Sequence, residues 1–155
     1  MKQYIDPFVQ VCTAVFKEMF NCDSKPDRAY FAGKETFLDW DISGVIALTG
    51  GVQGMVAISM KYSTAAKITG ILAETTAAVS STEMIDAVGE LVNIIAGNVK
   101  KNLEDLFRIT ISLPKVVYGK AHSVVIPDER LRMLCIPFLV FEEEIICLSI
   151  NINET

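Results

Sequence analysis

Residues 80–106 constrain the fold most, because their pattern predicts a single long amphipathic helix. At about 100° per residue, apolar side chains gather on one face of this helix as a continuous stripe. The stripe consists of Ile85, Val88, Val92, Ile95 and Val99. Ser80 and Glu83 have the spacing of a capping box, which places the N-cap at Ser80. The helix therefore has one face to bury and an opposite face that stays available.

The opposite face carries short polar residues and a glycine. With Glu90 as the reference, Asp86, Asn93 and Gly97 all lie within about 60° of it around the helix axis. The polar face of most helices is only solvated, and this is the simplest interpretation here as well. However, a glycine inside a helix costs about 1 kcal/mol relative to alanine, and both Gly97 and Gly89 flank the polar groups. These bare positions indicate that something docks closely on this face.

The segment 86–98 resembles the signature helix of the CheX/CheC/FliY family of chemotaxis phosphatases. In that family an acidic or serine residue, a glutamate and an asparagine stand at positions i, i+4 and i+7. Asp86, Glu90 and Asn93 have this spacing here. A proline follows later in the family pattern, and Pro114 takes its place in this chain.

The resemblance extends over nearly the whole chain, because residues 4–8 and 41–60 are also similar to the CheX branch. Only one motif is present, whereas two are common in CheC proteins. The resemblance implies a protein phosphatase that hydrolyses the phospho-aspartate of a phosphorylated CheY-like response regulator. It also implies that this chain needs no cofactor and no metal of its own, since Mg²⁺ is expected on the partner receiver. CheX-like proteins are dimers, which favours a homodimer.

Each motif residue has an expected role in that reaction. Asn93 inserts into the receiver site and orients the attacking water, because a carboxamide offers an acceptor and two donors on one short arm. Glu90 pairs with the receiver lysine and fixes the insertion geometry, with general-base catalysis by Glu90 as the alternative. Asp86 supports Glu90 or the docking face, and Gly89 and Gly97 let the backbone of the partner approach.

Two other functions fit the same residues. The middle domains of flagellar switch proteins resemble this fold and bind partners without catalysis, although the intact pair of Glu90 and Asn93 argues against such an adaptor. A structural dimerisation domain with a solvated helix face is the other alternative. Both alternatives predict that Asn93→Ala leaves function unchanged. Asn98 and Pro114 are expected to be structural.

Composition narrows the class of protein. With 155 residues, 51% of them apolar and 21% charged, the chain is expected to form one packed domain over residues 1–155. A net charge of −5 without a basic cluster argues against nucleic acid, and no apolar run is long enough for a membrane span. The four cysteines are scattered and His122 is the single histidine, so we expect reduced, buried thiols in a cytoplasmic protein and no metal site.

The rest of the chain predicts an α+β fold with helices packed on one face of an antiparallel or mixed sheet. Apolar residues at helical spacing predict a helix over residues 5–20, and Ser63 is placed to cap a short helix that ends near Glu74. Gly50 and Gly51 supply the tight turn of a hairpin. Strands are expected at 44–49, 53–60, 108–118 with an interruption near Pro114, 121–126, 131–141 and 145–152, and residues 30–40 are expected to be extended.

Pro137 limits where its strand can lie. Proline cannot donate to a strand ladder, so the strand is expected at a sheet edge or at a bulge. The segment 133–141 is otherwise long and apolar, which makes an open edge prone to aggregation. Pairing with a second subunit would cover this edge, so we expect a homodimer through edge strands. Coverage by a helix of the same chain is the alternative.

Overall fold

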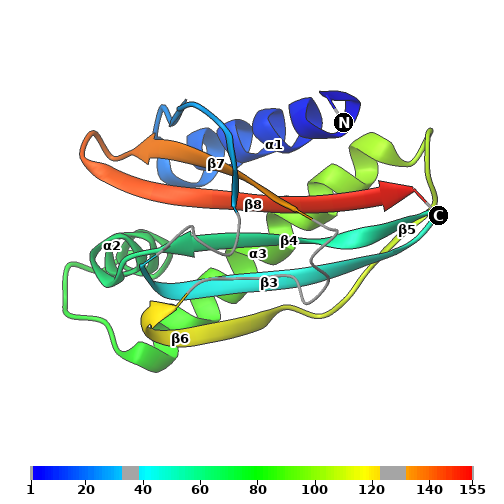
Figure 1. Cartoon of the computed structure of the whole chain (residues 1–155). Helices are drawn as coiled ribbons and strands as arrows, with labels where there is room; N and C mark the ends of the chain where they lie inside the picture. The colour runs from blue at the N-terminus through cyan, green and yellow to red at the C-terminus, as the bar shows by residue number, and fades with distance from the viewer. Residues whose placement is uncertain (1, 33–38, 123–131, 155) are drawn as a thin grey trace.

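The computed structural model describes residues 2–32, 39–122 and 132–154, and within these ranges three helices lie on one face of an eight-stranded antiparallel sheet (Figure 1). The helices are α1 (Lys2–Phe20), α2 (Tyr62–Leu72) and α3 (Ser81–Leu103). The strands are β1 (Lys25–Pro26), β2 (Tyr30–Ala32), β3 (Trp40–Gly50), β4 (Val52–Met60), β5 (Ile109–Ile111), β6 (Lys115–His122), β7 (Met133–Val140) and β8 (Glu144–Glu154). The predicted α+β class is confirmed.

The strand order is β1-β7-β8-β4-β3-β5, with β2 also pairing with β7 and β6 also pairing with β3. The main core lies between the sheet and the helices. It contains Phe8 and Phe16 from α1, Ile46 from β3 and Leu148 from β8, all of them fully buried. The predicted helix over 5–20 and both predicted hairpins are therefore present, and their apolar faces meet in one cluster.

The long helix begins where the sequence predicts. Ser80 Oγ accepts a hydrogen bond from Glu83 N at 3.1 Å, and Glu83 Oε1 accepts one from Ser80 N at 3.0 Å, which completes the capping box. The helix ends at Leu103, three residues before the predicted end. Leu106 N and Phe107 N both donate to Leu103 O, so the chain turns there toward β5.

α3 crosses the sheet diagonally, and its first turns project beyond the edge strand β6 (Figure 1). The helix lies close to β3 because Gly44 has no side chain. A β-carbon added at Gly44 would lie 2.9 Å from Val92 Cγ1 and 3.1 Å from Val88 O. The predicted apolar stripe therefore packs on the sheet, and the face that carries Glu90 turns away from it.

The first hairpin forms as predicted, but α2 is capped differently. Gly50 has a φ of 104°, as expected for the turn between β3 and β4. The prediction that Ser63 caps α2 is wrong, because the N-cap residue is Lys61, which forms no side-chain cap. Instead Asp41 Oδ2 accepts a hydrogen bond from Tyr62 N at 2.9 Å, and Ser63 Oγ donates to Glu144 Oε2 at 3.1 Å. A hydrogen bond to a residue 21 positions earlier in the chain leaves no local sequence signal.

The outer edge of β7 is covered by the same chain. β1 and β2 both pair with this edge, and Asp27 N donates to Pro137 O at 2.8 Å in the gap between them. The carbonyl group of Pro137 faces this outer side, but the expected edge position of its strand is wrong, because β1 and β2 lie beyond β7. Short strands, and not a helix or a second subunit, remove the aggregation hazard. Homodimerisation stays a prediction, without the exposed strand on which it was based.

Two other predicted segments are only partly described. The interruption near Pro114 is confirmed, since β5 ends at Ile111 and β6 begins at Lys115. The strand predicted at 121–126 coincides with the end of β6 as far as His122, and its remaining residues lie outside the described ranges. The same holds for residues 33–38 of the segment predicted to be extended.

All four cysteines are buried and free of disulfide bonds. Within the described ranges, no helix is both long enough and apolar enough to cross a membrane.

Candidate functional site on helix α3

α3 presents the motif residues to solvent. Asp86, Glu90 and Asn93 are exposed along one side of the helix, whereas Val88 and Val92 on the other side are fully buried. None of the three polar side chains forms a hydrogen bond or an ion pair within the part of the chain that the structure describes. Their donors and acceptors are therefore available to a partner, and they stand on a helix that is capped and packed on the sheet.

The two glycines of this helix have different surroundings. No atom lies within 4 Å of a β-carbon added at Gly97, so the space above this residue is open. Gly89 is buried, and a β-carbon there would lie 3.3 Å from Val116 Cγ2 and 3.9 Å from Pro114 Cγ. The role that we expected for Gly89 therefore needs correction. Its missing side chain makes room for β6 of the same chain, and of the two glycines only Gly97 has open space above it.

The connection between β5 and β6 borders this face. Ser112 N donates to Ala47 O at 3.0 Å, and Ser112 Oγ accepts from Ala47 N at 2.9 Å, so Ser112 is fixed to β3. Pro114 lies near Gly89, as the distance above shows, which agrees with the structural role expected for it. Between them Leu113 is 86% exposed.

Asn98 lies next to Gly97 but is already engaged. Its Nδ2 donates to Ile94 O at 3.0 Å, one turn earlier in the helix. This local hydrogen bond agrees with the structural role that the sequence indicates for Asn98.

A family model described as Chemotaxis phosphatase CheX matches residues 42–139, which is more than half of the chain and includes the whole α3 motif. This chain belongs to the CheX family. A CheC-like superfamily protein from Shewanella sp. PV-4 and CheX from Vibrio vulnificus are each 25% identical to it, with TM-scores of 0.84. The alignments cover 97% of this chain and 97% and 99% of those two chains, respectively.

One chain of a complex of CheX with CheY, BeF₃ and Mg²⁺ from Borrelia burgdorferi also has this fold. The matched chain is 24% identical, the TM-score is 0.77, and the alignment covers 97% of this chain and 98% of that one. No curated protein matches the sequence significantly. The family resemblance that the sequence indicates is thus confirmed, together with the fold that it implies.

A second polar cluster lies on the sheet face opposite the helices. Ser43 Oγ lies 2.7 Å from both Ser59 Oγ and His122 Nε2, and His122 Nδ1 lies 2.6 Å from Gly119 O. Because a carbonyl oxygen only accepts, His122 donates through Nδ1, and in a neutral ring Nε2 then accepts a hydrogen bond from the Ser43 hydroxyl. Ser43 is fully buried. A serine paired with a histidine resembles a nucleophile with its base, but a substrate has no access to this hydroxyl.

Two thiols lie further along the same face. Cys135 Sγ and Cys147 Sγ lie 3.6 Å and 3.7 Å from Ser149 Oγ, and both residues are buried. Hydrogen bonding to Cys147 lowers the pKa of the Cys135 thiol to about 7. The same contact, followed by burial, raises the pKa of Cys147. These thiols are on the far side of the sheet from α3, so they take no part in the candidate site.

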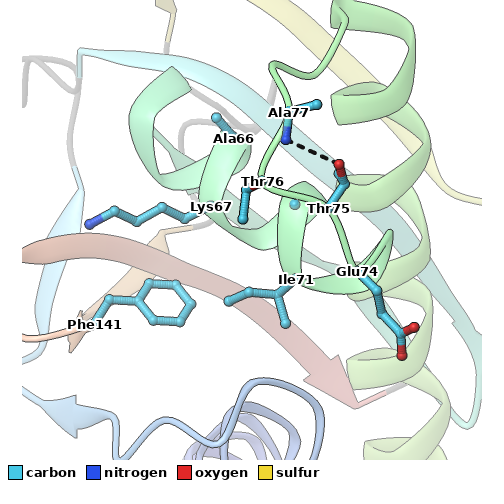
Figure 2. Close-up of a pocket in the computed structure, with 9 residues that line it drawn as sticks. Ala66, Lys67, Ile71, Glu74, Thr75, Thr76, Ala77 and Phe141 are labelled. Carbon is cyan, nitrogen blue, oxygen red and sulfur yellow. Dashed lines mark hydrogen bonds between the residues drawn. The ribbon is translucent and has the colours of Figure 1, made fainter.

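An open hollow lies at the end of α2, away from the motif. Figure 2 shows Ile71 of α2 facing Phe141, with the segment 74–77 along one side. The ammonium group of Lys67 at its rim is paired with Glu143 and Glu144 at 3.4 Å and 3.3 Å. The hollow thus has an apolar lining and no set of converging polar groups. Among the described residues, no group of three potential metal ligands occurs either here or at α3.

The sequence pattern singles out the helix residues of the site but not its border. Leu113 is separated from Asn93 by twenty positions, and nothing in the local sequence relates the two. The only available signal is a large apolar residue between Ser112 and Pro114 in a segment interrupted by proline. The pairing of β6 with β3 is what brings this segment against the helix.

Proposed function

We propose that this protein accelerates hydrolysis of the phospho-aspartate of a CheY-type response regulator in the cytoplasm. The observation that carries the proposal is the exposed pair of Glu90 and Asn93, one turn apart on a rigid helix and without partners in the described structure. The CheX family is a family of chemotaxis phosphatases, and the match includes both residues. The Borrelia CheX complex with CheY supports the choice of partner.

The chemistry suits a protein that supplies no nucleophile of its own. A phospho-aspartate is an acyl phosphate, so a water can attack phosphorus while the bond between phosphorus and the aspartyl oxygen breaks. The products are the free carboxylate and inorganic phosphate, which carries the protons of the water. The work left to a helper protein is to hold the water in line with the leaving oxygen.

Asn93 is the residue that we assign to this positioning. Its side chain is exposed and short, and its carboxamide oxygen accepts a hydrogen bond from the water while its NH₂ group donates to a phosphoryl oxygen. Water-positioning glutamines in GTPases do comparable work. We assign no metal or cofactor to this chain, and Mg²⁺ would be held by the receiver.

Glu90 is assigned to orientation. One turn from Asn93, its carboxylate would form a charge-assisted hydrogen bond with the receiver lysine and fix how deeply the carboxamide enters. General-base catalysis by Glu90 is the second assignment, ranked lower because water needs little activation against an acyl phosphate. Asp86 would extend the docking contact by one further turn, and the open space at Gly97 would accommodate the partner surface.

The test is single-turnover decay of each CheY-type receiver encoded in the same genome, phosphorylated with a small phosphodonor. We expect faster decay with the wild-type protein. Asn93→Ala should lower the accelerated decay rate roughly 100-fold, because a misplaced water reacts about that much more slowly. Binding of the receiver should persist. Asn102→Ala is the matched control, since Asn102 is also an exposed asparagine of α3. Glu90→Ala should weaken binding as well as rate.

The adaptor alternative gives a different result in the same assay. A receiver that binds but decays at its own rate, with either wild-type or Asn93→Ala protein, would identify a non-catalytic binding module. Accelerated decay that Asn93→Ala leaves intact would contradict the role of the carboxamide. The pH dependence of the maximal rate separates the two assignments of Glu90, because only a general base makes the rate follow the ionisation of that carboxylate.

A further inference from the structure

Leu113 is the most exposed of the large apolar side chains in the described structure. The exposed fraction is 86% for Leu113, against 62% for Leu106 and 51% for Ile145, which follow it. A fully exposed leucine forgoes the stabilisation that burial of this side chain would contribute. One such residue is common on a protein surface, so its position and its rigidity have to decide whether it has a function.

Its backbone is held in place on both sides. Ser112 exchanges two hydrogen bonds with Ala47, and Ser112 Oγ also donates to Leu113 O at 3.0 Å. Pro114 follows with a fixed φ and lies near α3, where its Cγ would be 3.9 Å from a β-carbon added at Gly89. The leucine is therefore an apolar side chain on a preorganised support, which loses little backbone freedom when it binds a partner.

Its position is next to the catalytic pair that we propose. Gly89, the helix residue near Pro114, is one turn before Asn93 and about 40° from it around the helix axis. Glu90 lies about 100° from Gly89 in the same sense, so Asn93 stands between the two and is nearer than Glu90 to the β5–β6 connection. A surface that receives Asn93 from above α3 would therefore also lie over Leu113.

Another exposed apolar side chain nearby, Tyr118 of β6, already has a partner within the chain. Tyr118 is 43% exposed, but its ring lies 5.0 Å from that of Tyr62, between ring centroids. Leu113 is 86% exposed, so only a small part of its side chain packs against the described chain. It is thus the least packed of the large apolar side chains of that part of the chain, and it stands at the border of the α3 face.

We infer that Leu113 is the apolar anchor of the receiver interface, where it packs against an apolar depression of the receiver beside the phosphorylation site. This inference rests on the proposed function for the identity of the occupant. Leu113 does not touch the reacting atoms. It holds the receiver on the α3 face, and it contributes affinity equally before and during the chemical step. Its removal therefore affects the concentration needed for half-saturation and not the maximal rate.

The test separates binding from catalysis with the same purified proteins. Decay of the phosphorylated receiver is measured over a range of phosphatase concentrations, and binding of the beryllofluoride-activated receiver is measured by calorimetry. We expect Leu113→Ser to raise both the half-saturating concentration and the dissociation constant about tenfold, with the maximal rate unchanged. Leu113→Met should restore wild-type values. Leu139→Ser is the matched control, because Leu139 is an exposed leucine on β7, far from α3 in the strand order.

The outcomes distinguish this inference from the proposed function. Leu113→Ser protein that binds the activated receiver like wild type, or loses no more than Leu139→Ser, overturns the role of Leu113 and leaves the phosphatase proposal intact. A wild-type protein that binds the receiver without accelerating its decay overturns the phosphatase proposal, and the calorimetric comparison still decides the role of Leu113. Absence of binding to every activated receiver overturns both.

Discussion

Gly44 of β3 lies directly against Val92 of α3, and this contact sets how closely the motif-bearing helix approaches the sheet. A β-carbon on Gly44 would be 2.9 Å from Val92 Cγ1, and the backbone oxygen of Val88 would be 3.1 Å away. Neither neighbour yields easily, because a valine side chain is stiff at χ1 and the oxygen belongs to the helix backbone. The glycine is therefore required by packing, and not by a positive φ.

Gly44→Ala should destabilise the fold by about 1–3 kcal/mol, the usual cost of overpacking a core. The extra methyl group forces α3 away from β3, which should also weaken receiver binding by shifting the helix relative to Leu113. Urea denaturation followed by circular dichroism measures the change in the free energy of unfolding. An unchanged midpoint would mean that the helix rests on the sheet less closely than the structure indicates.

Gly97→Ala should have the opposite effect on stability, and it serves as the comparison for Gly44→Ala. The space above Gly97 is open, so the added methyl group meets nothing while the helix gains about 1 kcal/mol of intrinsic propensity. The same urea titration checks this value. A larger side chain, as in Gly97→Leu, should keep most of the stability but raise the dissociation constant for the activated receiver. Unaltered binding by Gly97→Leu would place the interface away from this end of the helix.

Ser80→Ala should remove the capping box and cost about 1 kcal/mol of the free energy of unfolding. Both of its hydrogen bonds are present, from Glu83 N to Ser80 Oγ and from Ser80 N to Glu83 Oε1. Ser81→Ala is the control, because Ser81 is exposed within the first helical turn and has no hydrogen bond from its side chain in the described structure. Equal stabilities of Ser80→Ala and Ser81→Ala would mean that packing alone, and not the capping box, determines where the helix begins.

Much of this fold follows from local patterns. The capping box, the helical spacing of the apolar stripe and the turn at Gly50 are all encoded within a few residues, so the sequence predicts them correctly. What it misses depends on residues far apart in the chain. Asp41 caps α2 from a neighbouring strand, and β1 covers the edge of β7 through a pairing of Lys25 with Leu139. No pattern in either segment predicts which residues it pairs with.

The candidate site divides in the same way. Helical geometry places Glu90, Asn93 and Gly97 on one face, because their spacing alone determines this, and the structure shows all three there. Gly89 shares the sequence signal of Gly97, yet it is buried under β6, and only the sheet pairing reveals this difference. Leu113 lies at the border of the site because β6 pairs with β3, so its position is also not evident from the local sequence.

Alkaline pH should destabilise the protein through Cys12. Burial raises the pKa of this thiol to about 12 from its ordinary value of 9.0. The buried thiol thus stays neutral in the fold while the thiol of the unfolded chain ionises, so its contribution to stability is complete below pH 9 and is lost as pH rises toward 12. The expected loss is at most about 1.4 kcal/mol per pH unit from this residue.

Cys12→Ala should therefore reduce the fall in the free energy of unfolding between about pH 9.5 and 11, measured by urea titration at each pH. The fall should not vanish, because Cys147 and Tyr30 also have raised pKa values and act with the same sign. Cys135 acts in the opposite sense: its pKa is lowered to about 7, so its contribution is complete above pH 9 and is lost on acidification through pH 7. It does not affect the alkaline slope. Parallel slopes for wild type and Cys12→Ala would show that this thiol is reached by water in the folded protein.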